Sequence, residues 1–106
     1  MAIKRVWHGW TTPENADKYL HILQNQVIPG IEAKKLDGYR KFEILRLKHP
    51  TEVEFVTMIT FDTIDHVIAF QGEDYQKAYV PDAAKAVLKR WDLEIPHYDL
   101  IETREY

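Results

Sequence analysis

The sequence predicts an α+β domain whose elements follow the order β-α-β-β-α-β, with the four strands in one antiparallel sheet. Four segments have strand-like alternation or short apolar runs, and two helical segments separate them, the second broken in two. The chain has 106 residues, of which 45% are hydrophobic and 29% charged. That length suits one domain with one modest core, so we expect residues 1–106 to form a single unit.

The first half of the chain contains a strand, a helix and a second strand. The strand is expected over Ile3–Trp10, and Thr12-Pro13-Glu14 then supplies a hydroxyl cap, a first-turn proline and a first-turn acid. The helix should run to about Ile28 and end at Pro29-Gly30. After an Asp-Gly turn, the second strand is expected over Tyr39–Lys48.

The third strand, expected over Glu54–Phe61, is apolar or weakly polar on both faces. By strand parity, the side chains of Phe55, Thr57, Ile59 and Phe61 point one way, and those of Val56, Met58 and Thr60 the other. The chain has helices enough to cover only one side of its sheet. We therefore expect a homodimer in which the second face packs against the sheet of another copy.

The second half should hold two helical pieces and a last strand. Asp62 to Asp65 resembles a capping sequence for a short helix that stops at Gly72, and a further helix is expected over Asp82–Arg90. The last strand is expected over Leu93–Ile101, followed by a polar tail. With this order the first and third strands are central, which is the ferredoxin-like arrangement.

A set of short motifs in this order resembles the antibiotic biosynthesis monooxygenase domain family. They are Trp7-His8-Gly9, Asn15 to Tyr19, Pro29-Gly30, Glu54-Phe55, Ala69 to Asp74, Pro81 and His97-Tyr98. The resemblance implies a dimeric α/β barrel of two ferredoxin-like subunits, with a pocket between sheet and helices in each. Some relatives oxygenate aromatic polyketides without metal or flavin, and others degrade haem.

A cofactor-independent oxygenase needs an apolar pocket, a base or hydrogen-bond acceptor, and donors that stabilise an anion. We expect the substrate-binding residues to be Trp7, Arg5, Tyr75, Tyr79, Phe55 and Phe61, with Arg5 stabilising the anion. The candidate bases are His97, with Asp99 two positions away on its strand, and then His8. Each histidine also has a structural interpretation: His97 as a hydrogen-bonded core residue, and His8 as a structural or solvent-exposed one. Trp7 and Trp10 lie on opposite faces by parity, so only one of them can face a given pocket.

Other chemistries are disfavoured by composition. Cysteine and serine are absent, the histidines lack metal-ligand spacing, and the four glycines form no phosphate-binding loop, so we expect no metal and no cofactor. The neighbourhoods of Phe70 and Ala78 to Val80 lack the residues of haem-degrading relatives. A net charge of −3 argues against nucleic acid, and no segment predicts a membrane span or a signal peptide, so we expect a cytoplasmic protein.

Two functions fit these observations. The first is a cofactor-independent monooxygenase acting on a small aromatic or polyketide-like molecule. The second is a non-catalytic dimeric module that binds a small apolar or aromatic ligand in the same pocket.

Overall fold

The central pairing of the sheet joins the first and third strands, β1 (Ile3–Thr11) and β3 (Val53–Phe61). In the computed structural model, which describes residues 2–106, these strands run antiparallel from Ile3↔Phe61 to Thr11↔Val53. The edge strand β2 (Tyr39–Lys48) pairs with β3, which gives the order β2-β3-β1 and places β1 and β3 in the centre. This confirms the predicted ferredoxin-like arrangement.

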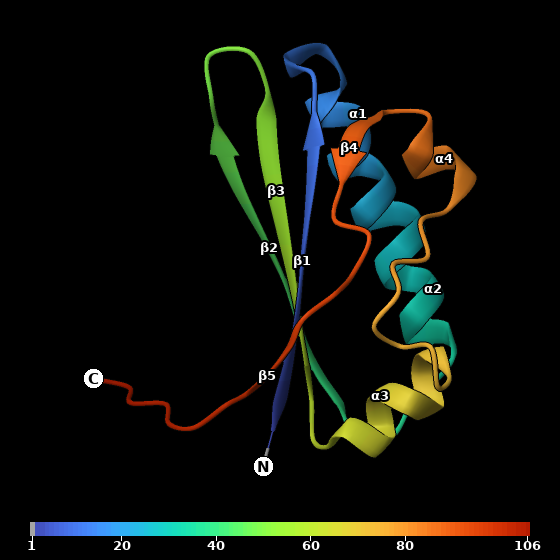
Figure 1. Cartoon of the computed structure of the whole chain (residues 1–106), viewed down its shortest axis with the longest axis vertical. Helices are drawn as coiled ribbons and strands as arrows, with labels where there is room; N and C mark the ends of the chain where they lie inside the picture. Colours follow the sequence, from blue (N-terminus) through green and yellow to red (C-terminus); the bar gives the residue numbers. More distant parts are fainter. Residues whose placement is uncertain (1) are drawn as a thin grey trace.

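The fourth position of the sheet is divided between two short strands, so the sheet has five strands and not the predicted four. β4 (Leu88–Trp91) pairs with the end of β1, and β5 (His97–Asp99) pairs with its beginning. The remaining elements lie on one face of the sheet (Figure 1). They are η1 (Pro13–Asn15), α1 (Ala16–Ile22), the π-helical turn η2 (Leu23–Val27), α2 (Ile28–Ala33), α3 (Ile64–Gln71) and α4 (Asp82–Lys85).

The prediction that the first helix ends at Pro29-Gly30 is wrong, because helical structure continues to Ala33. A proline inside an α-helix collides with the carbonyl four residues earlier. Here Pro29 is the second residue of α2 and stands in its first turn, just after η2, where the wider π-helical spacing has changed the hydrogen-bond pattern. The continued helix buries Ile31 against the core, and this burial stabilises the added turn.

The predicted helix over Asp82–Arg90 and strand over Leu93–Ile101 are also placed differently. α4 stops at Lys85, and Leu88 enters the sheet as the first residue of β4, where it is buried. The free edge of β1 needs hydrogen-bond partners, and this requirement outweighs a weak helical pattern. Leu93 is 75% exposed, because residues 93–95 leave the sheet and pair with residues 76–78.

The two faces of the sheet have different surroundings. On the covered face, two groups of buried side chains pack under the helices, one around Phe55 and Tyr19, the other around Phe61 and Val67. On the other face no helix is present in the described part of the chain, and Leu45 and Leu47 of β2 are 46% and 56% exposed. Val56 and Met58 of β3 lie next to them and are partly exposed. We call this uncovered side the open face.

Two glycines with positive φ provide a test of local packing. Gly38 has a φ of 75°, and a Cβ there would lie 2.4 Å from the His66 ring, whereas Gly72 has a φ of 88° and open space around it. Gly38→Ala should therefore lower the free energy of unfolding by about 2 kcal/mol or more, from backbone strain and a displaced ring together. Gly72→Ala should cost about 1–2 kcal/mol, from strain alone.

Gly30→Ala is the matched control, because Gly30 lies in α2 without positive φ, and an added methyl group there would meet no atom within 4 Å. This change should leave stability as it is or raise it by up to about 1 kcal/mol, since alanine favours the helix. Urea denaturation of the three variants checks the ranking. Equal losses for Gly38→Ala and Gly72→Ala would contradict the packing of His66 on Gly38.

Candidate functional site

A cavity of about 330 Å³ lies between the covered face of the sheet and the helices. β1 and β3 form its floor, the helix from α1 to α2 forms one wall, and residues 78–81 form another. Its lining is mostly apolar. The lining residues are Arg5, Trp7, Tyr19, Leu23, Val27, Gly30, Ile31, Lys34, Phe42, Thr57, Ile59, Phe70, Gln71, Ala78, Tyr79, Val80, Pro81, Ala84 and Ile95.

Arg5 is the charged group inside this cavity, and it is 5% exposed. Its Nη1 donates to the carbonyl oxygen of Tyr75 at 2.6 Å and contacts Nε2 of His97 at 3.0 Å. Within residues 2–106, no carboxylate forms an ion pair with it. Burial lowers the pKa of Arg5 to about 10, so the guanidinium remains protonated at neutral pH. A buried charge without a counter-ion is costly, and residues that retain one are candidates for a functional site.

Trp7 is held in a defined orientation on the cavity floor. Its Nε1 donates to the carbonyl oxygen of Asp92 at 2.8 Å. Its ring lies over Gly9, where an added Cβ would come within 3.1 Å of both the ring and Leu88. The glycine thus leaves room for the indole, and the hydrogen bond fixes it. Trp10 lies on the opposite, open face, as parity predicts, with the Arg90 guanidinium 3.8 Å from its ring centre.

The two phenylalanines predicted to bind substrate do not line the cavity. Phe55 and Phe61 are completely buried beneath it. Phe55 meets the ring of Tyr19 edge-on at 5.0 Å, and Phe61 stacks against Phe70 at 5.6 Å. Because Tyr19 and Phe70 are lining residues, the buried rings support the wall instead of touching a ligand.

Of the two predicted tyrosines, only Tyr79 lines this cavity. It is 60% exposed, so it stands at the mouth. Tyr75 lines a separate, more open hollow of about 620 Å³ that lies beside β5. Its ring meets the His97 ring edge-on at 4.9 Å, and its carbonyl accepts the Arg5 hydrogen bond. Tyr75 is therefore connected to the cavity through the hydrogen bond that its carbonyl oxygen accepts from Arg5.

His97 also lines the second hollow and not the cavity around Trp7. Burial, and after it the charge of Arg5, lower the pKa of His97 to about 4, so its ring is neutral at neutral pH. A neutral Nε2 accepts the hydrogen bond from Arg5. Asp99 borders the same hollow but makes no hydrogen bond to His97 among residues 2–106. The geometry thus gives His97 the task of holding Arg5 in place.

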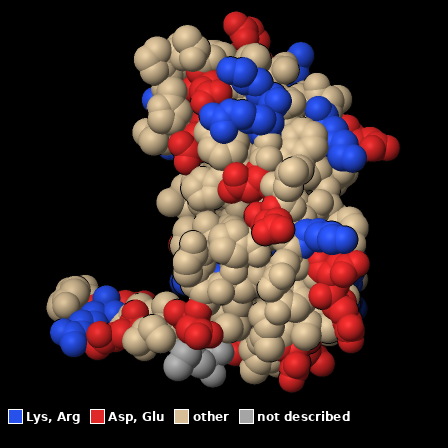
Figure 2. Space-filling model, viewed as in Figure 1, with Lys and Arg blue, Asp and Glu red and all other residues tan. Residues whose placement is uncertain are grey.

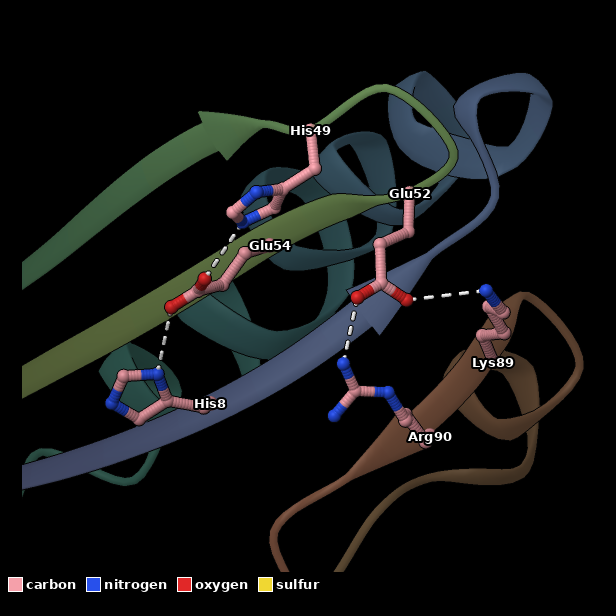
Figure 3. Close-up of polar contacts among 6 residues, drawn as sticks. All are labelled: His8, His49, Glu52, Glu54, Lys89 and Arg90. Atoms are coloured by element: carbon pink, nitrogen blue, oxygen red, sulfur yellow. Dashed lines mark hydrogen bonds and ion pairs between the residues drawn. The ribbon is translucent and has the colours of Figure 1, made fainter.

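His8, the second candidate base, lies on the open face, away from the cavity (Figure 3). Its Nδ1 lies 3.1 Å from Oε2 of Glu54, and Nε2 of His49 lies 3.1 Å from Oε1 of the same carboxylate. Hydrogen bonds from His49 and His8 hold the pKa of Glu54 below its usual range. His8 also stacks against Trp10 at 5.9 Å. It belongs to a polar group on the sheet surface.

Several residues that line the cavity were not predicted from the sequence. Thr57 and Ile59 line the cavity and share the strand parity of Phe55. The alternation of β3 could therefore have identified them as candidate lining residues. Lys34 lines the cavity as well, but it falls beyond the predicted end of the first helix. Nothing in its local sequence distinguishes it from other surface lysines.

The structure also bears on metals, membranes and surface charge. Among residues 2–106, no group of three or more His, Asp or Glu side chains could hold a metal ion. No helix in this part of the chain has the length and apolar character needed to cross a membrane. On the face drawn in Figure 2, the basic side chains lie in small groups next to acidic ones.

Two solved structures share this fold. One, provisionally named an antibiotic biosynthesis monooxygenase, from Bacillus cereus, has a TM-score of 0.69 at 13% identity over 100% of this chain and 97% of that one. Another with the same provisional name, from Nitrosomonas europaea, has a TM-score of 0.65 at 13% identity over 97% and 94%. No family model and no curated protein matches the chain. The likenesses confirm the predicted fold, and at this identity they show the fold alone.

The low pKa of His97 leads to a prediction about stability. The pKa falls from 6.5 in the unfolded chain to about 4 in the fold, so between these values the unfolded state binds more protons. Stability from this group is complete above pH 6.5 and is lost as the pH falls toward 4. His97→Gln should flatten the decline of melting temperature across that window, whereas substitution of the exposed His21 by Gln should not. An unchanged decline in His97→Gln would show that the ring is not buried as described.

Proposed function

We propose that the protein is a cofactor-independent monooxygenase that acts on a small aromatic or polyketide-like molecule in the cavity around Arg5 and Trp7. The observation that carries this proposal is a buried guanidinium, without a carboxylate partner among the described residues, inside a mostly apolar cavity. A volume of about 330 Å³ suits a ligand of two or three fused rings. The fold shared with two provisionally named monooxygenases is consistent with it.

The reaction begins with the substrate anion, because dioxygen reacts slowly with neutral closed-shell molecules. A hydroxyarene that loses its O–H proton becomes an electron-rich phenolate. An electron pair from a ring carbon then forms a C–O bond to dioxygen, giving a hydroperoxide. Loss of the C–H proton and cleavage of the O–O bond yield a quinone and water, so one dioxygen is consumed for each product.

The residues of the cavity have distinct roles in this scheme. Arg5 stabilises the negative charge of the phenolate and so lowers the pKa of the bound substrate. Trp7 and Tyr79 pack against the aromatic rings. His97 and the Tyr75 carbonyl hold the guanidinium in position. The substrate proton leaves to solvent, since the open mouth gives water access.

The alternative is a non-catalytic module that binds such a ligand. One observation favours it: no His, Asp or Glu is among the lining residues, so the described cavity wall lacks the side chains that most often act as general bases. A substrate that is acidic enough to ionise beside Arg5 needs no general base from the protein, so the monooxygenase remains compatible with this lining. The two functions therefore differ in turnover and not in binding.

Oxygen uptake with a panel of hydroxylated naphthalenes and anthracenes separates these functions. The monooxygenase should consume dioxygen in proportion to quinone formed, and Arg5→Gln should reduce turnover about a hundredfold. Arg40→Gln, a change of an exposed arginine paired with Asp62, is the charge-matched control. Raised melting temperatures without oxygen uptake would establish the binding module instead, and neither effect would rule out both.

We also propose that two copies pair through the open face, as a homodimer without nucleic-acid or membrane partners. Leu45 and Leu47 are exposed there beside Val56 and Met58, and their burial would remove an apolar surface from water. Trp10 and Tyr98 add aromatic surface on the same side. Two pairs of its polar residues, His8 with Glu54 and Glu52 with Arg90, are already joined within one chain (Figure 3).

Sedimentation should give a mass of about 25 kDa at low micromolar concentration, twice the 12.6 kDa of one chain. Val56→Glu places a charge in the middle of the open face and should convert the dimer to monomer or unfold it. Gln24→Glu, on the exposed helix surface, should leave the dimer intact. A stable folded monomer of the unaltered chain would contradict the proposal.

A further inference from the structure

We infer that the cavity selects ligands that are bound as oxygen anions, namely aromatic monoanions whose charge lies on oxygen atoms, such as carboxylates and acidic enols. Arg5 is the charge partner inside the cavity, and Lys34 attracts the ligand at its mouth. This inference rests on the proposed use of the cavity as a ligand site, and it specifies the class of ligand.

The first support is the charge balance of the lining. Its ionisable cations are Arg5 and Lys34, and no Asp or Glu is among the lining residues. The two cations flank the same aromatic ring: the guanidinium carbon of Arg5 lies 5.9 Å and the Lys34 Nζ 5.2 Å from the centre of Phe70. A neutral ligand would leave the guanidinium without water and without a counter-ion, and a cationic ligand would be repelled.

The second support is the unused donor capacity of Arg5. A guanidinium has five N–H groups, and both hydrogen bonds of this one come from Nη1, to the Tyr75 carbonyl and to His97. Both acceptors are neutral groups, so neither compensates the charge. Among residues 2–106, Nε and Nη2 make no hydrogen bond, yet neither is among the polar atoms that are enclosed without a partner. These N–H groups therefore remain accessible from the cavity.

Geometry favours oxygen anions. A planar carboxylate or enolate can accept two parallel N–H bonds from a guanidinium, and such charge-assisted pairs are among the strongest hydrogen bonds in proteins. Most of the rest of the wall, including Trp7, Phe42 and Ile59, is apolar and suits an aromatic skeleton. The site thus combines one buried positive charge with a mostly apolar wall, and an aromatic acid has the complementary combination of one negative charge and an apolar ring system.

The position of Lys34 gives it a different role. It is exposed at the end of α2, whereas Arg5 is buried. A charge at the rim changes mainly the rate of association and its dependence on salt, and a buried charge partner changes mainly the rate of dissociation. The two cations should therefore be separable by kinetics.

The test uses three ligands with one skeleton and different charges: 2-naphthoate, 2-naphthylmethanol and 2-naphthylmethylammonium. They are titrated into the unaltered protein at pH 7.5, with heat and Trp fluorescence as readouts. We expect naphthoate to bind about tenfold to a hundredfold more tightly than the alcohol, from one buried charge-assisted contact, and the ammonium ion to bind most weakly.

Variants assign the effect to residues. Arg5→Gln should reduce naphthoate affinity to that of the alcohol and leave alcohol affinity unchanged. Lys34→Gln should slow naphthoate association and weaken its salt dependence, with little change in dissociation. Lys18→Gln removes an exposed lysine from the same helical run, outside the cavity lining, and should change neither rate.

The outcomes distinguish this inference from the proposed function. Equal affinities for naphthoate and the alcohol would overturn the anion selectivity while leaving the cavity as a ligand site. Selectivity that survives in Arg5→Gln would overturn the role of Arg5. Absence of binding by all three ligands would overturn the inference together with the proposed ligand site. The three ligands are compared on the unaltered protein, so this part of the test does not depend on whether any variant folds.

Discussion

The antiparallel pairing of β1 with β3, from Ile3↔Phe61 to Thr11↔Val53, is the constraint on which the rest of the structure depends. Side chains alternate between the two faces of a strand, so a slip of one residue would exchange every covered side chain for an uncovered one. In the observed register, Arg5 and Trp7 face the helices. The same register places Val56 and Met58 on the open face, so the cavity and the proposed dimer surface follow from one alignment.

The buried charge of Arg5 opposes stability, and the fold accommodates it without neutralising it. Its two hydrogen-bond acceptors, the Tyr75 carbonyl and the His97 ring, come from segments that are far from β1 in sequence. Burial and the adjacent guanidinium keep His97 neutral, which preserves its lone pair for Arg5. Sites that retain costly polar groups without compensation are where function is concentrated.

The open face and the cavity differ in how their charges are compensated. On the open face, each of two carboxylates has two partners: Glu54 with His8 and His49, and Glu52 with Lys89 and Arg90 (Figure 3). These groups can therefore approach another protein surface without leaving a charge unpaired. In the cavity the compensation is missing, and the proposed anionic ligand supplies it. The contrast distinguishes the proposed dimer surface from the proposed ligand site within one small sheet.

Two features were predictable from the sequence alone: the central pair of strands, from the β-α-β-β-α-β order, and the shared face of Arg5 and Trp7, because period-two alternation is a local property. Which face meets the helices was not predictable in this way. The sequence did not determine where helices end: Pro29 is a stop signal locally, and only burial of Ile31 and the π-helical turn explain its place inside a helix. Nor did it separate the roles of the histidines. His97 and Arg5 are 92 positions apart, and their contact depends on the register that places them opposite each other in β5 and β1. Such contacts arise only in the tertiary structure, because two segments that are distant in sequence must pair in one register before their side chains can meet.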